Sequence, residues 1–244
     1  MRMLFFDLET SPNLVYTWGL FNQNIGINQI VEPTQVLCFG AQWLGEKKVH
    51  FRSVHHDGKE AMLDHLHELM DEADVLCGWN SQQFDHGHIR REFIEAKMTP
   101  PSPTKDYDLM RVAKTARWPS NKLDYVAQRL GVGSKVQHEG FDLWRKCMAG
   151  EDAAWKRMRK YQIQDVKLLV ELYEELKPWA PKKHPGRNVI DGVTDGCPVC
   201  GKAEWHRRGY ESLSTGKYQK FQCRNCGSWS RSKSSEFSTT MRSI

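Results

Sequence analysis

The hydrophobic pattern along the first 178 residues predicts strands first, then an alternation of strands and helices, and then mostly helices. Apolar or alternating runs, typical of strands, cover residues 1–8, 13–20, 36–44, 48–55 and 75–79. Apolar residues at helical spacing predict helices over residues 59–73, 84–97, 120–130, 141–148 and 153–176. Residues 1–8 are apolar on both faces, as in a central strand. This order predicts an α/β fold in which helices flank a mixed sheet.

Turn-forming and polar residues separate these elements. Residues 22–34 are polar with Gly and Pro and are expected to form a loop, and residues 45–47 predict a hairpin turn. Three prolines within residues 99–103 break the chain, and Asp106 and Asp108 behind them are expected in a loop. In the helix over residues 84–97, the inward-facing residues are expected to be Ile89, Phe93 and Ile94.

The pattern changes after Pro178, which indicates a second, smaller unit. Residues 1–178 form the first predicted domain. Residues 179–195 are rich in Pro, Lys and Gly without periodicity and predict a linker. A cysteine-containing unit follows at residues 196–230, and the Ser/Thr-rich residues 231–244 predict a flexible tail.

Composition and charge narrow the class of protein. The 244 residues are 39% hydrophobic and 27% charged, as in ordinary globular proteins. No apolar run approaches the roughly 18 residues that span a bilayer, and the sequence starts with a strand pattern rather than a signal peptide. We therefore expect a cytoplasmic protein without a membrane partner. From residue 196 onward, nine Lys/Arg face three Asp/Glu, which favours a polyanion such as nucleic acid.

The first strand carries a pair of carboxylates. In Phe5-Phe6-Asp7-Leu8-Glu9-Thr10, Asp7 and Glu9 leave the strand on the same side because side chains alternate between faces. Two adjacent carboxylates repel unless a cation lies between them, and Mg²⁺ or Mn²⁺ prefers such oxygen ligands. The alternative is an edge strand with two solvated acids.

Two later elements carry further acids. In Asn80-Ser81-Gln82-Gln83-Phe84-Asp85, a strand ends near Asn80 and Asp85 opens a helix. The helix dipole also stabilises an Asp at a helix start, so the alternative is that Asp85 has a purely structural role. Tyr161 and Asp165 are four residues apart and share one helix face, although both are also common surface residues.

Taken in order, these three elements resemble the DEDD (DnaQ-like) superfamily of 3′→5′ exonucleases, which have a ribonuclease H-like fold. The sequences of the three motifs are most similar to those in the exonuclease domain of family B DNA polymerases. The motifs are Phe-Asp-Leu-Glu-Thr, Gly-Trp-Asn…Phe-Asp and Tyr-Gln-Ile-Gln-Asp-Val. It also resembles stand-alone phage exonucleases with a trailing zinc finger. The resemblance covers roughly residues 1–178. From it we expect a bacteriophage source, and therefore a location in the cytoplasm of the host.

The resemblance implies a site and a reaction. Four metal ligands and a tyrosine follow from the matching positions, namely Asp7, Glu9, Asp85, Asp165 and Tyr161. Two Mg²⁺ or Mn²⁺ ions about 3.5–4 Å apart would clamp the scissile phosphate, and Tyr161 would orient the attacking water. The chain falls in the tyrosine subfamily because Lys160 stands where the other subfamily has its histidine. The product would be a nucleoside 5′-monophosphate.

Three residues near these motifs are candidates for substrate binding. Asn80 matches the motif's Asn and would position the strand end or the substrate, and Phe84 could pack on a terminal base. Lys122 lies at a predicted helix start and could contact a phosphate. The alternative for Phe84 is a core residue.

The cysteines predict a metal site. Cys197-Pro-Val-Cys200 and Cys223-Arg-Asn-Cys226 are separated by 22 residues, a spacing typical of a Cys₄ site for one structural Zn²⁺. The segment between them is expected to be a hairpin with its turn at residues 214–216, so that the unit is a zinc ribbon. The alternative is four free thiols. The three remaining cysteines lie singly in apolar contexts and suit a reducing compartment.

The ribbon also interleaves cations with aromatic residues. Basic candidates for contacts with nucleic acid are Arg207, Arg208, Lys217 and Lys220. Five aromatic residues lie among them, Trp205, Tyr210, Tyr218, Phe221 and Trp229, and suit base stacking. The alternative is that several of these aromatics form the ribbon's small core.

The sequence thus predicts an exonuclease on DNA, on single strands or frayed 3′ ends, in replication, proofreading or repair, with a DNA polymerase or other replication protein as a further partner. An RNA exonuclease or a structure-specific nuclease on the same fold stays open. So does a non-catalytic nucleic-acid-binding module, although the presence of all four acids and the tyrosine in order argues against lost activity.

Overall fold

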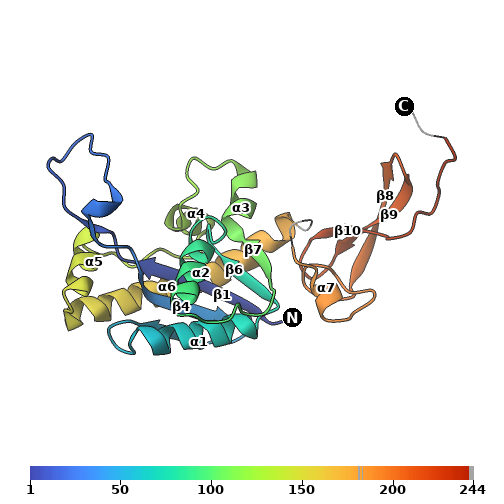
Figure 1. The fold of residues 1–244 in the computed structure, drawn as a ribbon. Helices are drawn as coiled ribbons and strands as arrows, with labels where there is room; N and C mark the ends of the chain where they lie inside the picture. The colour runs from blue at the N-terminus through green and yellow to red at the C-terminus, as the bar shows by residue number, and fades with distance from the viewer. Residues whose placement is uncertain (181, 183, 242–244) are drawn as a thin grey trace.

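The computed structural model describes residues 1–180, 182 and 184–241. Its first 178 residues form an α/β unit, and a small β unit follows (Figure 1). The strands of the first unit are β1 (Met3–Thr10), β2 (Leu14–Val15), β3 (Ile30–Glu32), β4 (Val36–Trp43), β5 (Val49–Ser53), β6 (Val75–Gly78) and β7 (Lys105–Asp108). Its helices are α1 (Lys59–Asp71), α2 (Asp85–Glu95), α3 (Leu109–Ala113), α4 (Leu123–Leu130), α5 (Phe141–Met148) and α6 (Asp152–Leu176). Short 3₁₀ turns are η1 (Ile27–Gln29), η2 (Lys114–Ala116) and η3 (Lys177–Trp179).

The main sheet has five strands in the order β5-β4-β1-β6-β7, so β1 is central as predicted. β4 and β5 are antiparallel and form the expected hairpin. β1 pairs antiparallel with β4 but parallel with β6, and β6 pairs parallel with β7. The sheet is therefore mixed, and the carboxyl ends of β1, β6 and β7 meet at one edge.

The alternation of side chains along β1 separates two cores. Met3 and Phe5 pack with α3, α4 and α6 on one face, whereas Leu4 and Phe6 pack with α1 and α2 on the other. Because Asp7 and Glu9 continue the series of Met3 and Phe5, they lie on the face that α6 covers. The fold thereby directs both carboxylates toward α6.

Several sequence expectations need correction. The strand expected over residues 13–20 is reduced to the two residues of β2, and the expected loop at 22–34 contains η1 and β3. β2 pairs antiparallel with β3 at the base of this excursion. Within α2, Ile89 and Phe93 are buried as predicted, but Ile94 is exposed because it lies one residue around the helix from the sheet-facing stripe.

The prediction that Asp106 and Asp108 lie in a loop is wrong, since both belong to strand β7. β7 completes the parallel edge of the sheet, and Tyr107 between the two acids is buried in the core. Asp108 is also buried and caps α3 by accepting a hydrogen bond from the backbone N–H of Met110 at 3.0 Å.

The segment expected to be a linker is packed against the first unit where the structure describes it. It contains the end of η3 and the short helix α7 (Arg187–Ile190). His184 is buried and its Nε2 lies 3.0 Å from the hydroxyl of Tyr173 on α6. The amino terminus of Met1 pairs with Asp191, and Lys105 donates to the carbonyl of Pro185 at 2.7 Å. Pro181 and Lys183 lie outside the described residues.

The C-terminal unit is a three-stranded sheet in the order β10-β9-β8. Its strands are β8 (Trp205–Leu213), β9 (Gly216–Cys223) and β10 (Trp229–Arg231), so the predicted hairpin and turn are confirmed. Part of the tail lies beside β9, where Lys217 donates to the carbonyl of Phe237 at 2.7 Å. Residues 242–244 lie outside the described part of the tail. Among the described residues, no helix has the length and apolarity to cross a membrane.

Candidate active site

A close approach between α6 and the sheet brings the site together. Gly40 on β4 lies directly opposite Asp7 on β1. A Cβ at Gly40 would lie 2.8 Å from Val166 Cγ2 and 3.1 Å from Gln162 Cγ, so glycine is what permits α6 to pack this closely. The side chain of Gln162 then donates to the backbone carbonyl of Asp7 at 2.6 Å and to its carboxylate at 3.0 Å.

Three of the four predicted carboxylates converge. Asp7, Glu9 and Asp165 each present an oxygen within 4.8 Å of the others. The fourth, Asp85, lies outside this set of three but beside it, since its Oδ1 accepts from the backbone N–H of Leu8 at 3.3 Å. Asp85 is buried at the start of α2. This position is also the one that the structural alternative, stabilisation by the helix dipole, predicts.

Burial and mutual proximity raise the pKa values of the carboxyls in this cluster. Burial, together with the nearby charge of Asp165, raises the pKa of Asp7 to about 7. Burial and Asp7 raise the pKa of Glu9 and of Asp85 well above their usual values. Asp165 Oδ1 is buried without a hydrogen-bond partner among the described residues. Carboxylate oxygens that are crowded and incompletely paired are a donor set that suits a divalent cation.

A lysine that the sequence motifs do not include lies in this cluster. Lys135, in the segment between α4 and α5, donates to Asp165 Oδ2 at 2.5 Å and to the hydroxyl of Tyr161 at 2.8 Å. Burial raises the pKa of Tyr161, and the adjacent Asp165 raises it further. The carboxylate of Asp165 and the Tyr161 hydroxyl raise the pKa of Lys135 against the effect of its own burial. Lys135 therefore stays charged and offsets part of the negative cluster.

Two more residues complete the surroundings. The indole of Trp144 on α5 hydrogen-bonds to the carboxyl of Glu9, and its ring lies 6.1 Å from that of Tyr161. The ring of His138 lies 4.9 Å from Tyr161 on another side. The sequence motifs include none of these three residues, which lie within residues 131–148: Lys135, His138 and Trp144. In this range the sequence predicted only the short helix over residues 141–148. The one feature that could have indicated them is the group of polar and aromatic residues in and before that helix.

The remaining candidates near the site lie around the end of β6 and at α4. Asn80 adopts a left-handed backbone conformation, with φ at 65°, and its N–H donates to Asp108 at 2.9 Å. This turn directs the chain from β6 into α2, and the positioning role of Asn80 stays a prediction. Phe84 is exposed rather than in the core and lies against His88, with ring centroids 4.6 Å apart. Lys122 is exposed immediately before α4.

The four predicted cysteine ligands also converge, with their sulfurs within 4.8 Å of one another. Cys197 Sγ lies 3.7 Å from Cys226 Sγ, and Cys200 Sγ lies 3.6 Å from Cys223 Sγ. A tetrahedron with Zn–S bonds of about 2.3 Å has edges of roughly 3.8 Å, so the donors fit Zn²⁺. The cluster is compatible with a zinc ribbon.

The cations and aromatics of the ribbon are paired with each other. Lys217 lies 4.3 Å from the ring of Tyr210, and Arg231 lies 4.1 Å from that of Tyr218. Trp205 instead packs on Phe221 beside the cysteines, as the core alternative predicted for some of these residues. The predicted basic candidates Arg207, Arg208 and Lys217 are exposed, and Lys220 is half-buried.

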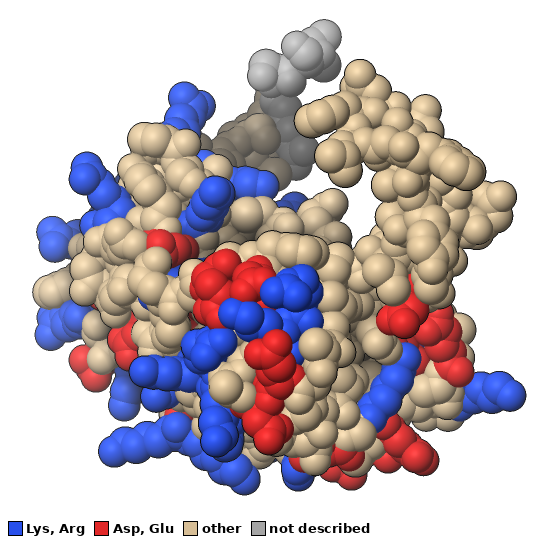
Figure 2. Space-filling view, turned by 90° about the vertical axis from the view of Figure 1, so that its left-hand side faces the viewer, with Lys and Arg blue, Asp and Glu red and all other residues tan. Residues whose placement is uncertain are grey.

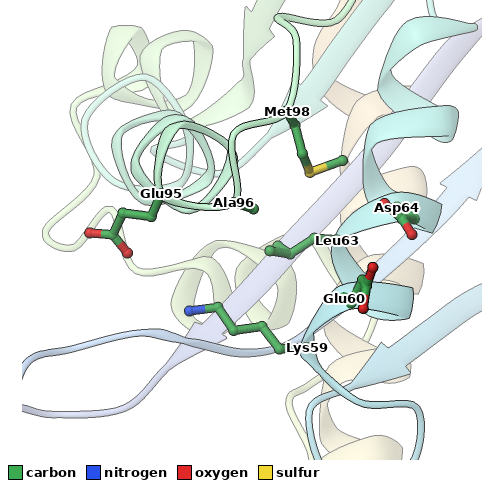
Figure 3. Close-up of a pocket in the computed structure, with 7 residues that line it drawn as sticks. All are labelled: Lys59, Glu60, Leu63, Asp64, Glu95, Ala96 and Met98. Carbon is green, nitrogen blue, oxygen red and sulfur yellow. The ribbon is translucent and has the colours of Figure 1, made fainter.

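A separate pocket of about 400 Å³ lies between α1 and the end of α2 (Figure 3). Acidic residues dominate its polar lining, since Glu60, Asp64 and Glu95 accompany a single cation, Lys59. Lys59 is itself paired with the buried Glu92 at 2.7 Å. This pocket contains none of the candidate site's carboxylates and is poorly suited to a phosphate.

Comparisons with solved structures bear on the fold of the chain. The chain is similar in structure to a family B DNA polymerase from the archaeon Pyrobaculum calidifontis, with 15% identity and a TM-score of 0.56. The match covers 88% of this chain and 31% of the polymerase, so the chain spans about a third of that protein. A structure of RNase D from Trypanosoma brucei matches at 12% identity and a TM-score of 0.48, over 83% of this chain and 69% of that one.

A comparison with curated proteins gave no match. The family assignment rests on the sequence itself, because residues 4–177 match the family described as the RNase_H superfamily. This range contains β1, β6, α2 and α6, the elements that carry the four carboxylates. The ribonuclease H-like fold predicted from the motifs is therefore confirmed, and the chain belongs to the RNase_H superfamily.

Proposed function

We propose that the chain is a metal-dependent 3′→5′ exonuclease that releases nucleoside 5′-monophosphates from DNA. The observation that carries the proposal is the convergence of Asp7, Glu9 and Asp165 to within 4.8 Å, with Tyr161 held beside Asp165 through Lys135. A structural network would instead pair each of these acids with its own cation.

Asp7, Glu9, Asp85 and Asp165 would hold two Mg²⁺ or Mn²⁺ ions, which supply a lowered pKa for bound water and charge stabilisation for the phosphate. Asp85 is buried beside β1, where its Oδ1 accepts from the backbone N–H of Leu8, and it would be the fourth ligand. Gln162 fixes the carboxylate of Asp7, and Trp144 fixes that of Glu9. These bonds keep the two β1 acids oriented toward α6.

Tyr161 is the residue we assign to orienting the attacking water. Its hydroxyl accepts a hydrogen bond from Lys135 and also lies within hydrogen-bonding reach of Asp165, so its own proton points to the side of that carboxylate, where the attacking water would lie. The raised pKa of Tyr161 keeps the phenol protonated at neutral pH. The tyrosine would therefore act as a hydrogen-bond donor that positions the water, and this role supports our proposal that the chain belongs to the tyrosine subfamily.

The C-terminal unit would hold the strand. We propose residues 1–178 as the nuclease domain, 179–195 as the connection, 196–230 as a ribbon with one structural Zn²⁺, and 231–244 as a tail. The exposed cations Arg207, Arg208 and Lys217 would neutralise phosphates, as would Lys122 beside the site. Asn80 would position the strand end, and the exposed ring of Phe84 is available to a terminal base.

DNA is the proposed substrate because the structural match with the higher TM-score is a DNA polymerase. Replication or repair, with a polymerase or another replication protein as partner, is the corresponding setting. The cytoplasmic location and the bacteriophage source stay predictions from the sequence.

The test is cleavage of a 5′-labelled single-stranded DNA with Mg²⁺ or Mn²⁺. We expect a ladder that shortens from the 3′ end and disappears with EDTA and in Asp7→Ala. Asp64→Ala, which removes an exposed acid in the pocket of Figure 3, is the matched control and should act like the wild type. Intact DNA, or a single internal cut, would contradict the proposal. The matching RNA in the same assay decides between the two sugars.

A further inference from the structure

The excursion between β1 and β4, residues 13–32, is unusual in composition. We call it the arm. No Asp, Glu, Lys, Arg or His occurs between Glu9 and Glu32, whereas the chain's average of 27% charged residues would place about six there. Figure 2, which looks from the left-hand side of Figure 1, shows the arm at upper right as a projection free of blue and red. Lys and Arg gather on the opposite side of that view.

The arm exposes its apolar residues instead of burying them. Of the 19 large hydrophobic side chains exposed among the described residues, eight belong to the arm: Leu14, Tyr16, Trp18, Leu20, Phe21, Ile25, Ile27 and Val31. Trp18 is 99% exposed. A folded protein seldom exposes such a group of residues unless the group binds a partner.

The polar groups of the arm hold its shape from within. Gln29 donates to the carbonyl of Tyr16 at 2.9 Å, and the backbone N–H of Tyr16 donates to the carbonyl of Gln29 at 2.9 Å. Gln23 donates to the carbonyl of Phe21 at 2.9 Å. The amide side chains therefore form hydrogen bonds within the arm, while the aromatic rings are exposed to solvent. These internal hydrogen bonds give the arm a defined shape.

Topology places the arm beside the candidate active site. It follows β1 directly, and Asn13 is four residues after Glu9. On the other side, β7 ends at the same edge of the sheet and leads into residues 109–123, which we call the basic lobe. The basic lobe has four cations and no acid: Arg111, Lys114, Arg117 and Lys122. Both projections rise from the sheet on the same side in Figure 1.

We propose that the arm holds unpaired bases of the strand whose 3′ end occupies the candidate active site. A single strand has an anionic backbone and uncharged aromatic bases. The cations of the basic lobe are complementary in charge to the phosphates of the backbone. The uncharged arm exposes three aromatic rings on which bases could stack, those of Tyr16, Trp18 and Phe21. This inference rests on the proposed function and specifies it, since a strand gripped by its bases must be single-stranded beside the site.

The test compares two strands of equal length and charge. Binding of a labelled single-stranded DNA and of a strand whose internal nucleotides lack bases is measured by fluorescence anisotropy, in an Asp7→Ala background that prevents cleavage. For Trp18→Ala we expect about tenfold weaker binding of the base-bearing strand and no change with the abasic strand. Trp18→Phe should restore most of the affinity, because a phenyl ring still stacks.

A matched control is Trp179→Ala, which removes another exposed tryptophan, on η3 at the far end of α6. It should bind both strands like the parent. Equal affinity of Trp18→Ala and its parent for the base-bearing strand would overturn the proposal, and so would an equal loss on both strands. A dimer that Trp18→Ala converts to a monomer in light scattering, with unchanged DNA affinity, would identify the arm as a contact between copies instead.

Hydrolysis of the p-nitrophenyl ester of thymidine 5′-monophosphate separates this inference from the proposed function. The ester has a scissile phosphodiester but no neighbouring base. We expect the otherwise wild-type Trp18→Ala protein to hydrolyse it at the wild-type rate. If wild type hydrolyses neither ester nor DNA, the proposed function fails, and the anisotropy comparison still decides whether the arm binds bases.

Discussion

Lys135 and Asp165 form a charge pair, 2.5 Å between Nζ and Oδ2, although they are 30 residues apart in sequence. Asp165 is buried on α6, and the same ammonium donates to Tyr161. The pair lies within the carboxylate cluster, where Lys135 is the cation that reaches both a predicted metal ligand and the predicted water-orienting tyrosine.

Replacing Lys135 with Met should therefore destabilise the protein in buffer free of Mg²⁺ and Mn²⁺, with zinc retained. Methionine keeps most of the stem but leaves Asp165 buried without its partner, which we expect to cost about 2 kcal/mol. Added Mn²⁺ should narrow the difference, because the ion would replace the lost charge. Thermal unfolding with and without Mn²⁺ measures this. Lys167→Met, an exposed position on α6, is the control and should show no such metal dependence.

The pKa of Asp7, raised to about 7, predicts a pH dependence of stability. Between about pH 4 and 7 the folded protein binds more protons at this carboxyl than the unfolded chain, so the free energy of unfolding should fall as pH rises. We expect a loss of about 3 kcal/mol across this range, measured by denaturant titration without Mg²⁺ or Mn²⁺. Asp7→Asn, which does not titrate, should reduce the dependence, and the raised pKa values of Glu9 and Asp85 leave a smaller slope of the same sign. An unchanged slope would contradict the assignment to Asp7.

Parts of the site could be predicted because they depend on local geometry. Asp7 and Glu9 share a face since strand side chains alternate, and Tyr161 and Asp165 share one since they are a helical turn apart. Lys135 could not be found this way, because no periodicity in residues 131–140 fixes where its side chain lies. Asp108 was missed for a similar reason: its place depends on the pairing of β7 with β6, which is not local.

The arm shows where an alternating pattern predicts both the wrong element and the wrong environment. Leu14, Tyr16, Trp18 and Leu20 alternate with small or polar residues, as in a half-buried strand. The structure exposes all four. Periodicity reports which residues would share a face but not whether another element covers that face, and here the described residues do not bury it.

Tyr161→Phe should lower kcat on single-stranded DNA by about 10²-fold with little change in KM, because the ring still packs but the positioning hydroxyl is lost. Initial rates over a range of DNA concentrations measure both constants. The control is Tyr107→Phe, whose buried hydroxyl has no hydrogen-bond partner among the described residues, so its removal should leave kcat unchanged. Equal rates for wild type and Tyr161→Phe would remove Tyr161 from the mechanism.

Gly40→Ala should weaken both stability and activity, since the new methyl would meet Val166 and Gln162 and push α6 from the sheet. We expect about 1–3 kcal/mol of destabilisation and at least a tenfold loss of activity from the displaced Asp165 and Gln162. Denaturant titration and the ladder assay measure the two effects. Gly87→Ala, where a Cβ meets no atom within 4 Å, should be as stable as the wild type.

Loss of zinc should unfold the C-terminal unit while leaving the α/β unit intact. The buried apolar residues of the ribbon are few, with Cys197, Val199 and Cys223 at their centre, so its folding free energy would come mainly from the metal. We expect one zinc per chain by atomic emission, none in Cys223→Ser, and rapid proteolysis of that variant after residue 195. Cys77→Ala, in the main core, should keep its zinc. A Cys223→Ser protein as protease-resistant as the wild type would show that the ribbon folds without metal, and the four thiols would then be structural neighbours rather than ligands.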